Sequence, residues 1–120
     1  MSDRITLTGI KGFGYHGILE FEAVDGQDFI VDLVIVLDLA QASVTDDLDD
    51  TIDYGPLAAM VVEEIEGERV KLIEKLAGRI ADRIALEHQN ISQVIVTVHK
   101  SQAPVEVELV DVSVTIERNR

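Results

Sequence analysis

The residue of this chain best suited to take part in a chemical reaction is Lys100, which directly follows an apolar stretch at residues 91–99. If that stretch is a β-strand, alternate side chains share a face, and Lys100 continues the row of Val96 and Val98. We therefore expect its amine to point at an apolar wall, where desolvation disfavours the charged form. Such an amine can act as a general acid and base near neutral pH. The alternative is a lysine beyond the sheet edge whose amine reaches solvent.

Three further polar residues interrupt apolar or glycine-rich stretches: Glu22, Tyr54 and Glu74. Glu74 falls at the start of a predicted helix, where the macrodipole stabilises a carboxylate. Such a carboxylate can accept two parallel hydrogen bonds from an amidine-like edge, as in a 2-aminopyrimidinone; the alternative is a glutamate that faces water. The Tyr54 hydroxyl can relay a proton, or the ring can simply cover apolar surface. Glu22 alone is indistinguishable from an ordinary loop carboxylate.

The histidines and the lack of cysteine argue against a metal site. His16, His88 and His99 show neither H-x-H nor H-E-x-x-H spacing, and the chain has no cysteine. His16, in a glycine-rich segment, is expected to be structural, and His99 alternates with Lys100 and so points to the opposite face. We expect no metal and no cofactor. The residues alone therefore indicate a lysine, carboxylate and tyrosine site without a defined reaction.

The charge balance excludes several classes of partner. With 23 acidic and 10 basic residues the formal charge is −13, which repels nucleic-acid phosphates and anionic membranes. The absence of a phosphate-binding loop disfavours highly phosphorylated substrates. The apolar fraction of 47% is typical of a folded protein, and no run approaches a membrane span or a signal peptide. We expect a cytoplasmic protein with one domain over residues 1–120 that binds a neutral or modestly polar small molecule.

Hydrophobic periodicity predicts six main elements. Strands are expected at residues 4–10, 27–39, 91–99 and 107–118, and helices at residues 54–66 and about 70–87. Between the first two strands, four glycines in residues 9–17 predict a bulged continuation where another backbone or a ligand comes close. The order β-β-α-α-β-β predicts an α+β fold, a four-stranded antiparallel sheet with both helices on one face. Because residues 27–39 are apolar on both faces and the sheet has open edges, we expect a ring-forming oligomer.

Several short motifs, taken in order, resemble the dihydroneopterin aldolase family of folate biosynthesis. They are Gly14-Tyr-His-Gly17 followed by Glu22, Asp50-Thr-Ile-Asp-Tyr54, Leu72-Ile-Glu74, and His99-Lys100 with Ala103-Pro104. The resemblance covers nearly the whole chain. It implies a tunnelling-fold subunit that forms homo-oligomeric rings of four, with two rings stacked into an octamer. It also implies active sites between subunits, with Tyr54 from one subunit and Glu22, Glu74 and Lys100 from its neighbour.

The resemblance also implies a reaction and a role for each site residue. The reaction is the retro-aldol cleavage of 7,8-dihydroneopterin, a small-molecule pterin, to 6-hydroxymethyl-7,8-dihydropterin and glycolaldehyde, without a metal or a Schiff base. Lys100 would be the acid and base, Tyr54 would support proton transfer, and Glu22 would hold the lysine and a water. Glu74 and the backbone at Ile73 would bind the amino edge of the pterin. Epimerisation at C2′ is an expected side activity.

Two alternatives to this reaction stay open at the level of sequence. One is an epimerase acting on dihydroneopterin triphosphate, and the other is a ring protein that binds pterins without catalysis. The chain also departs from the family pattern after the lysine, where Ser101 and Val105 replace the usual proline and isoleucine. A less rigid loop there would loosen the placement of Lys100.

Overall fold

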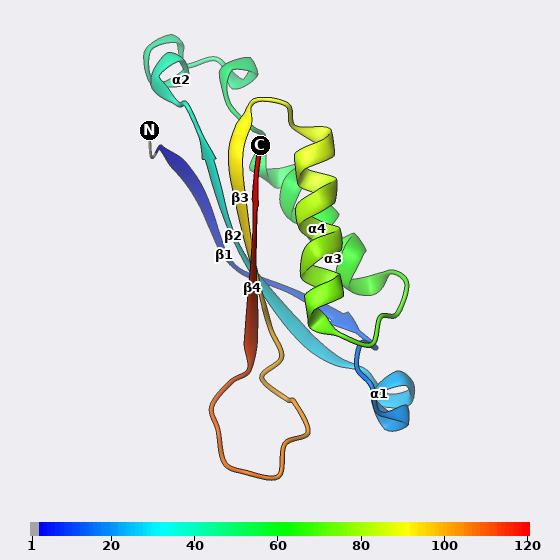
Figure 1. Ribbon diagram of the computed structural model, residues 1–120. Helices are drawn as coiled ribbons and strands as arrows, with labels where there is room; N and C mark the ends of the chain where they lie inside the picture. Colours follow the sequence, from blue (N-terminus) through cyan, green and yellow to red (C-terminus); the bar gives the residue numbers. More distant parts are fainter. Residues whose placement is uncertain (1–2) are drawn as a thin grey trace.

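The computed structural model describes residues 3–120 and contains one antiparallel sheet in the strand order β1-β2-β3-β4. The strands are β1 (Arg4–Gly14), β2 (Gln27–Leu37), β3 (Ile91–His99) and β4 (Ser113–Asn119). Each pairs with its neighbour in antiparallel register, and Val96, for example, lies opposite both Leu33 and Ile116. Figure 1 shows the strands as long, twisted ribbons, with the two chain ends at the same end of the sheet but on its opposite edge strands, β1 and β4. The predicted four-stranded antiparallel sheet is confirmed.

The two long helices, α3 (Tyr54–Glu66) and α4 (Ile73–Glu87), cover the same face of this sheet (Figure 1). Helix α3 packs on β1, and α4 packs on β3 and β4. Proline at the third position of α3 suits a helix start, and the Asp53 side chain caps the helix by accepting from the Gly55 N–H. The prediction of two helices on one face is confirmed. Within residues 3–120, no helix has the length and apolar character needed to cross a bilayer.

The core lies between the sheet and the helices because one set of alternate side chains in the strands points toward the helices. In β2, Phe29, Val31, Leu33, Ile35 and Leu37 are buried, and the intervening residues are half-exposed on the other face. Buried residues of α4 recur at helical spacing and meet this row. Each fully buried aliphatic side chain contributes about 1.5–3 kcal/mol relative to an exposed one. The fold is thus specified by a single apolar face of the sheet.

The glycine-rich segment continues β1 and accommodates the end of α3. A bulge follows Leu7, where Gly9 takes a positive φ of 79°. At Gly14, a Cβ atom would lie 2.6 Å from the backbone oxygen of Ile65, so only glycine lets α3 approach this closely. The expected bulge and the expected close approach of another backbone are both confirmed.

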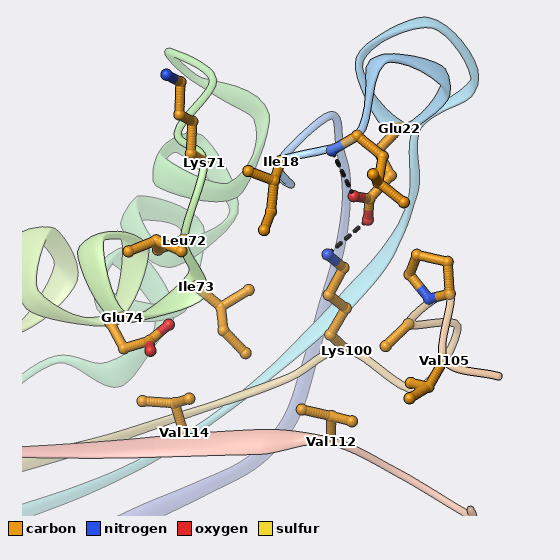
Figure 2. Close-up of a pocket in the computed structure, with 13 residues that line it drawn as sticks. Ile18, Glu22, Lys71, Leu72, Ile73, Glu74, Lys100, Val105, Val112 and Val114 are labelled. Atoms are coloured by element: carbon orange, nitrogen blue, oxygen red, sulfur yellow. Dashed lines mark hydrogen bonds and ion pairs between the residues drawn. The ribbon is translucent and has the colours of Figure 1, made fainter. Parts of the chain in front are cut away.

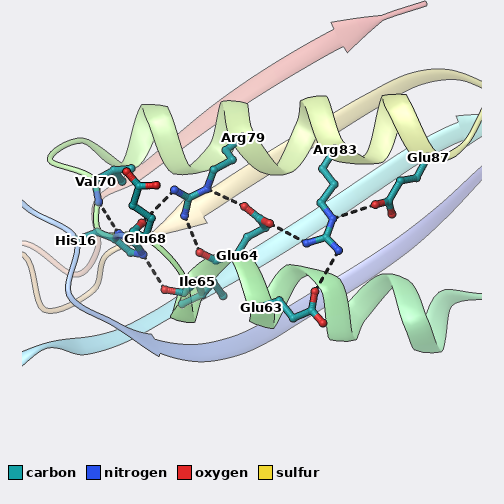
Figure 3. Close-up of polar contacts among 9 residues, drawn as sticks. All are labelled: His16, Glu63, Glu64, Ile65, Glu68, Val70, Arg79, Arg83 and Glu87. Carbon is teal, nitrogen blue, oxygen red and sulfur yellow. Dashed lines mark hydrogen bonds and ion pairs between the residues drawn. The ribbon is translucent and has the colours of Figure 1, made fainter.

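A buried histidine fastens the same segment to the loop between α3 and α4 (Figure 3). The Val70 N–H donates to Nδ1 of His16 at 3.0 Å, so Nε2 carries the proton and donates to the Ile65 carbonyl at 2.7 Å. Burial lowers the pKa of His16, and the nearby Arg79, Arg69 and Lys100 cations lower it too, against the opposing effect of the Ile65 hydrogen bond. His16 is therefore a neutral structural residue, as expected from its sequence context.

Two arginines of α4 hold α3 alongside it (Figure 3). Arg79 donates to the backbone carbonyls of Glu64 and Glu68, which satisfies acceptors at the end of α3. Arg83 contacts the carboxylates of Glu63 and Glu64 on α3 and of Glu87 one turn along α4. This network fixes the end of α3, and with it the loop that leads into α4.

Two expected element starts were wrong. The last strand begins at Ser113 and not at residue 107, because β3 ends at His99, opposite Ser113, and residues 107–112 have no strand beside them. Helix α4 begins at Ile73 and not near residue 70, since the Val70 backbone is bonded to His16 and Gly17. The sequence patterns also missed the short helices α1 (Glu20–Asp25) and α2 (Ala40–Thr45) and the 3₁₀ turn η1 (Leu48–Asp50).

Acidification should destabilise the fold through His16. From pH about 6.5 to about 5 the unfolded chain takes up a proton that the folded histidine excludes, so the free energy of unfolding should fall by up to about 1.4 kcal/mol per pH unit. His99, whose pKa the Asp111 and Asp32 hydrogen bonds raise, acts in the opposite direction near pH 6.5, where the unfolded chain is only about half protonated at this residue, and adds little slope toward pH 5. Urea denaturation at several pH values measures this. The His16→Gln variant should be less stable, but its free energy of unfolding should depend less on pH over that window. An unchanged dependence on pH would contradict the assignment of His16 as a neutral buried residue.

Candidate active site

A cavity of about 390 Å³ opens at the end of the sheet where β3 and β4 part (Figure 2). Four segments of the chain line it: the entry to α1, the start of α4, the loop after β3, and β4 with the residue before it. In that order the lining residues are Ile18, Leu19 and Glu22, then Lys71–Glu74, then Lys100 and Ala103–Val105, and then Val112 and Val114. The volume and the apolar walls with a few charged groups are typical of a small-molecule site.

An ion pair between Lys100 and Glu22 dominates the electrostatics of the cavity. Lys100 Nζ lies 2.5 Å from Glu22 Oε2, and the two side chains are only 12% and 1% exposed. Figure 2 shows the ammonium directed upward to this carboxylate from among the apolar residues of the loop and β4. The predicted orientation of Lys100 on the face of Val96 and Val98 is confirmed. The wall around it is largely apolar, as expected, and it also contains the Glu22 carboxylate, which is the counter-charge of the ammonium.

Three donors hold Glu22 in its ionised form. Burial by itself raises the pKa of Glu22, but hydrogen bonds from Lys100, the Leu19 N–H and Gln27 outweigh burial and bring the pKa below its ordinary value. The Leu19 N–H donates to Oε1 at 3.1 Å, and the Gln27 amide donates to Oε2 at 3.3 Å. A buried carboxylate needs such partners because an unpaired buried charge is very costly. Glu22 is therefore a fixed anion next to the lysine.

Glu22 belongs to helix α1 rather than to a loop, and Gly17 makes room for it. Gly17 has a φ of 148°, a conformation that L residues rarely adopt. A Cβ atom at this position would lie 2.3 Å from Glu22 Oε1. The Gly17 N–H also donates to the Val70 carbonyl at 2.9 Å, so the same residue connects α1 to the loop before α4. The position of the Glu22 carboxylate thus requires glycine at residue 17.

The first turn of α4 presents Ile73 and Glu74 to the other side of the cavity. In Figure 2 the Glu74 carboxylate and the Lys100 ammonium lie on opposite sides, with the Ile73 side chain between them. Ile73 is buried and fixes the helix start, while Glu74 is exposed to the cavity at the positive end of the helix dipole. No side-chain cap satisfies the N–H groups of this first turn. The helix start therefore offers a carboxylate and free backbone donors to a ligand.

Tyr54 is the one predicted site residue that this chain does not bring to the cavity. It is the first residue of α3, is 64% exposed, and does not line the cavity with the other four. Glu22, Ile73, Glu74 and Lys100 do meet there. A site that includes Tyr54 would thus need the tyrosine of a second copy.

Several residues that line or support the cavity were not anticipated from sequence. Gln27 is buried at the start of β2 and donates to Glu22, and a polar residue beginning an otherwise apolar strand was the available signal. Val112, just before β4, and Val114, within it, also line the cavity. Val105 lines the cavity next to Pro104. The loop that carries it is ordered by two short backbone bonds, from Ala103 N–H to the Lys100 carbonyl at 3.1 Å and from Val105 N–H to the Ala103 carbonyl at 2.9 Å.

The chain that forms this cavity is similar to known proteins over nearly its whole length. Residues 5–117 match the family model described as dihydroneopterin aldolase. The chain is 48% identical over 118 residues to a dihydroneopterin aldolase of Streptomyces coelicolor, covering 98% of both chains, and 39% identical to that of Bacillus subtilis, covering 98% of both. A crystal structure of the Escherichia coli dihydroneopterin aldolase in complex with neopterin superposes with a TM-score of 0.88 at 26% identity. That match covers 98% of this chain and 99% of the other.

Replacing Gly17 by alanine should disrupt the Lys100–Glu22 pair. We expect a loss of roughly 3–5 kcal/mol in the free energy of unfolding, because the new methyl displaces a buried carboxylate in addition to straining the backbone. Gly9→Ala is the matched control: it also has a positive φ but open space around its Cβ, so it should cost only about 1–2 kcal/mol. Urea denaturation of both variants measures the difference, and equal losses would contradict the proposed contact.

Proposed function

Because this chain belongs to the dihydroneopterin aldolase family, we propose that it catalyses the retro-aldol cleavage of 7,8-dihydroneopterin in folate biosynthesis. The products are 6-hydroxymethyl-7,8-dihydropterin and glycolaldehyde. The observation that carries the site assignment is the Lys100–Glu22 ion pair facing Glu74 across one cavity. A carboxylate on one side suits the amino edge of a pterin, and a held ammonium on the other suits proton transfer to its ring.

In this proposal Glu74 accepts hydrogen bonds from the 2-amino group and N3 of the pterin, assisted by the backbone at Ile73. Two parallel charge-assisted hydrogen bonds fix the plane and direction of the ring. The apolar walls, among them Val112 and Val114, then enclose the two faces of the heterocycle. Binding at this edge directs the C6 side chain of the substrate toward Lys100.

Lys100 acts as the acid and base. It donates a proton to N5 and, through a water, removes the proton of the C2′ hydroxyl. The C1′–C2′ bond then breaks, its electrons move into the C6=N5 group, and C2′ leaves as the aldehyde carbon of glycolaldehyde. Protonation of C1′ with loss of the N5 proton completes the hydroxymethyl product. No metal or Schiff base is needed, because the substrate's own C=N group accepts the electrons. Recombination of the aldehyde gives C2′ epimerisation as a side activity.

Glu22 positions the lysine and a water, and its low pKa keeps it ionised throughout. The carboxylate stabilises the ammonium in the form that donates to N5, and it recovers its partner when the proton returns. Tyr54 supports the proton transfer from the neighbouring subunit.

We infer further that the chain forms rings of four that stack into a homo-octamer in the cytoplasm, with each active site between two subunits. Three features support this inference. Tyr54 is exposed and away from the cavity of its own chain, Ile18 at the cavity mouth is 69% exposed, and β1 and β4 each have a single strand neighbour. Open strand edges and an apolar rim are both costly unless another copy covers them.

Replacing Lys100 by alanine should lower kcat about 100- to 10,000-fold with little change in pterin binding, whereas Glu74→Ala should weaken binding about 100-fold. The assay follows hydroxymethyl pterin and glycolaldehyde formed from 7,8-dihydroneopterin in the presence of a chelator. Lys75→Ala, at an exposed neighbour of Glu74 on α4, is the control and should retain full activity.

Other outcomes of the same assay identify the alternatives. Inversion at C2′ without glycolaldehyde would indicate an epimerase. Unchanged turnover in Lys100→Ala, combined with lost binding in Glu74→Ala, would indicate a pterin-binding protein without the proposed chemistry.

Co-expression of Lys100→Ala with Tyr54→Ala chains should restore activity that neither variant shows alone. If each site takes Lys100 from one subunit and Tyr54 from its neighbour, about a quarter of the sites in a random mixture contain both residues. The specific activity of the purified mixed oligomer measures this fraction. Mixed oligomers as inactive as the separate variants would rule out sites shared between subunits.

A further inference from the structure

On the face of the sheet opposite the helices, the His99 imidazole bridges two carboxylates. Its Nδ1 lies 2.6 Å from Asp111 Oδ2 and its Nε2 lies 2.7 Å from Asp32 Oδ2. Carboxylates only accept, so both ring nitrogens must carry protons for both contacts to be hydrogen bonds. The ring is therefore an imidazolium held between two anions. The mechanism above makes no use of this cluster.

The cluster connects four segments of the chain across the sheet. Asp32 lies on β2, and its other oxygen, Oδ1, accepts the Gly9 N–H at 2.7 Å from the bulge in β1. His99 is the last residue of β3, and Asp111 lies near the end of the loop that joins β3 to β4. The chain of contacts thus extends from the bulge of β1 to the loop at residues 100–112. The base of this loop, residues 100 and 112, adjoins the ends of β3 and β4.

That base lies next to the reacting amine. The Lys100 N–H donates to the Val112 carbonyl at 2.7 Å, which closes the loop just beyond the last pair of β3 and β4, His99 and Ser113. Because side chains alternate along a strand, His99 anchors the loop on one face while Lys100 reaches Glu22 on the other. The loop also supplies residues 103–105 to the cavity wall. The placement of Lys100 thus depends on how firmly this base is held.

We propose that His99 is a positioning residue for Lys100, and that its imidazolium, through Asp32 and Asp111, clamps the base of the loop in the arrangement that catalysis requires. This proposal rests on the proposed aldolase function. Loss of one proton leaves one nitrogen with a lone pair that faces a carboxylate, so that contact becomes repulsive and the clamp opens. A misplacement of the amine by about 1 Å can cost about 100-fold in rate.

The charges around His99 determine the direction of the pH effect. Asp111 and Asp32 raise its pKa, so the clamp is complete at low pH and is lost as the pH rises through that raised value. The strand neighbours Thr97 and Ser113 are uncharged. On the same face of β1, Lys11 is paired with Asp28 at 3.7 Å. The rate of cleavage should accordingly decline on the alkaline side with the deprotonation of His99.

Two variants test the clamp through kcat, KM and the pH profile of kcat. His99→Gln keeps a polar side chain but cannot bridge two carboxylates as a cation, so kcat should fall about 10-fold or more while KM changes less than about twofold. Asp111→Asn removes one of the two anions that retain the proton, so the alkaline decline should move to lower pH. Asp28→Asn removes the same charge from the same face without contacting His99 and should leave the decline in place.

Exchange of the Lys100 amide hydrogen provides a readout that does not need substrate. An opened clamp should expose the bond to the Val112 carbonyl, so exchange in folded His99→Gln should be about 10-fold faster than in the unmodified protein. If the unmodified protein cleaves no dihydroneopterin, the proposed function fails, and this exchange rate alone decides whether the clamp exists. If His99→Gln does not fold, Asp111→Asn provides the same measurements. Unchanged kcat, pH profile and exchange, or a change in KM alone, would overturn the proposal.

Discussion

The buried ion pair between Lys100 and Glu22 is the interaction on which the site depends. Two charges withdrawn from water are costly, and their mutual attraction offsets that cost only when further hydrogen bonds complete the geometry. Leu19 and Gln27 complete it around the carboxylate. The pair joins the end of β3 to helix α1, which are far apart in sequence, so the cavity and its electrostatics form together.

Much of the remaining architecture holds these two charges and Glu74 at a fixed separation. Gly17 lies against the Glu22 carboxylate on one side and bonds to Val70 on the other, and His16 bonds to the same loop. That loop leads directly into the first turn of α4, where Glu74 lies. A short motif therefore couples both sides of the cavity through backbone contacts, which change less readily than contacts between flexible side chains.

The end of β3 shows how a strand can separate chemistry from anchoring. His99 and Lys100 are neighbours in sequence but face opposite sides of the sheet. The first is surrounded by carboxylates on the half-exposed face, and the second reaches a single carboxylate in the cavity. Asp32, Asp111 and Glu22 are thus the counter-charges that fix the two side chains in place.

The sequence by itself determined the sheet, the two long helices and the face that each strand buries, because alternation and helical periodicity are local patterns. The motifs also identified Glu22, Ile73, Glu74 and Lys100, all of which reach one cavity. Only the tertiary structure decided that Glu22 meets Lys100, that Tyr54 lies elsewhere, and that residues 107–112 form a loop despite a strand-like pattern. These outcomes depend on which distant segments pack together. A strand needs a neighbouring strand and a buried charge needs a counter-charge, and the local spacing of residues does not show which segment supplies either one.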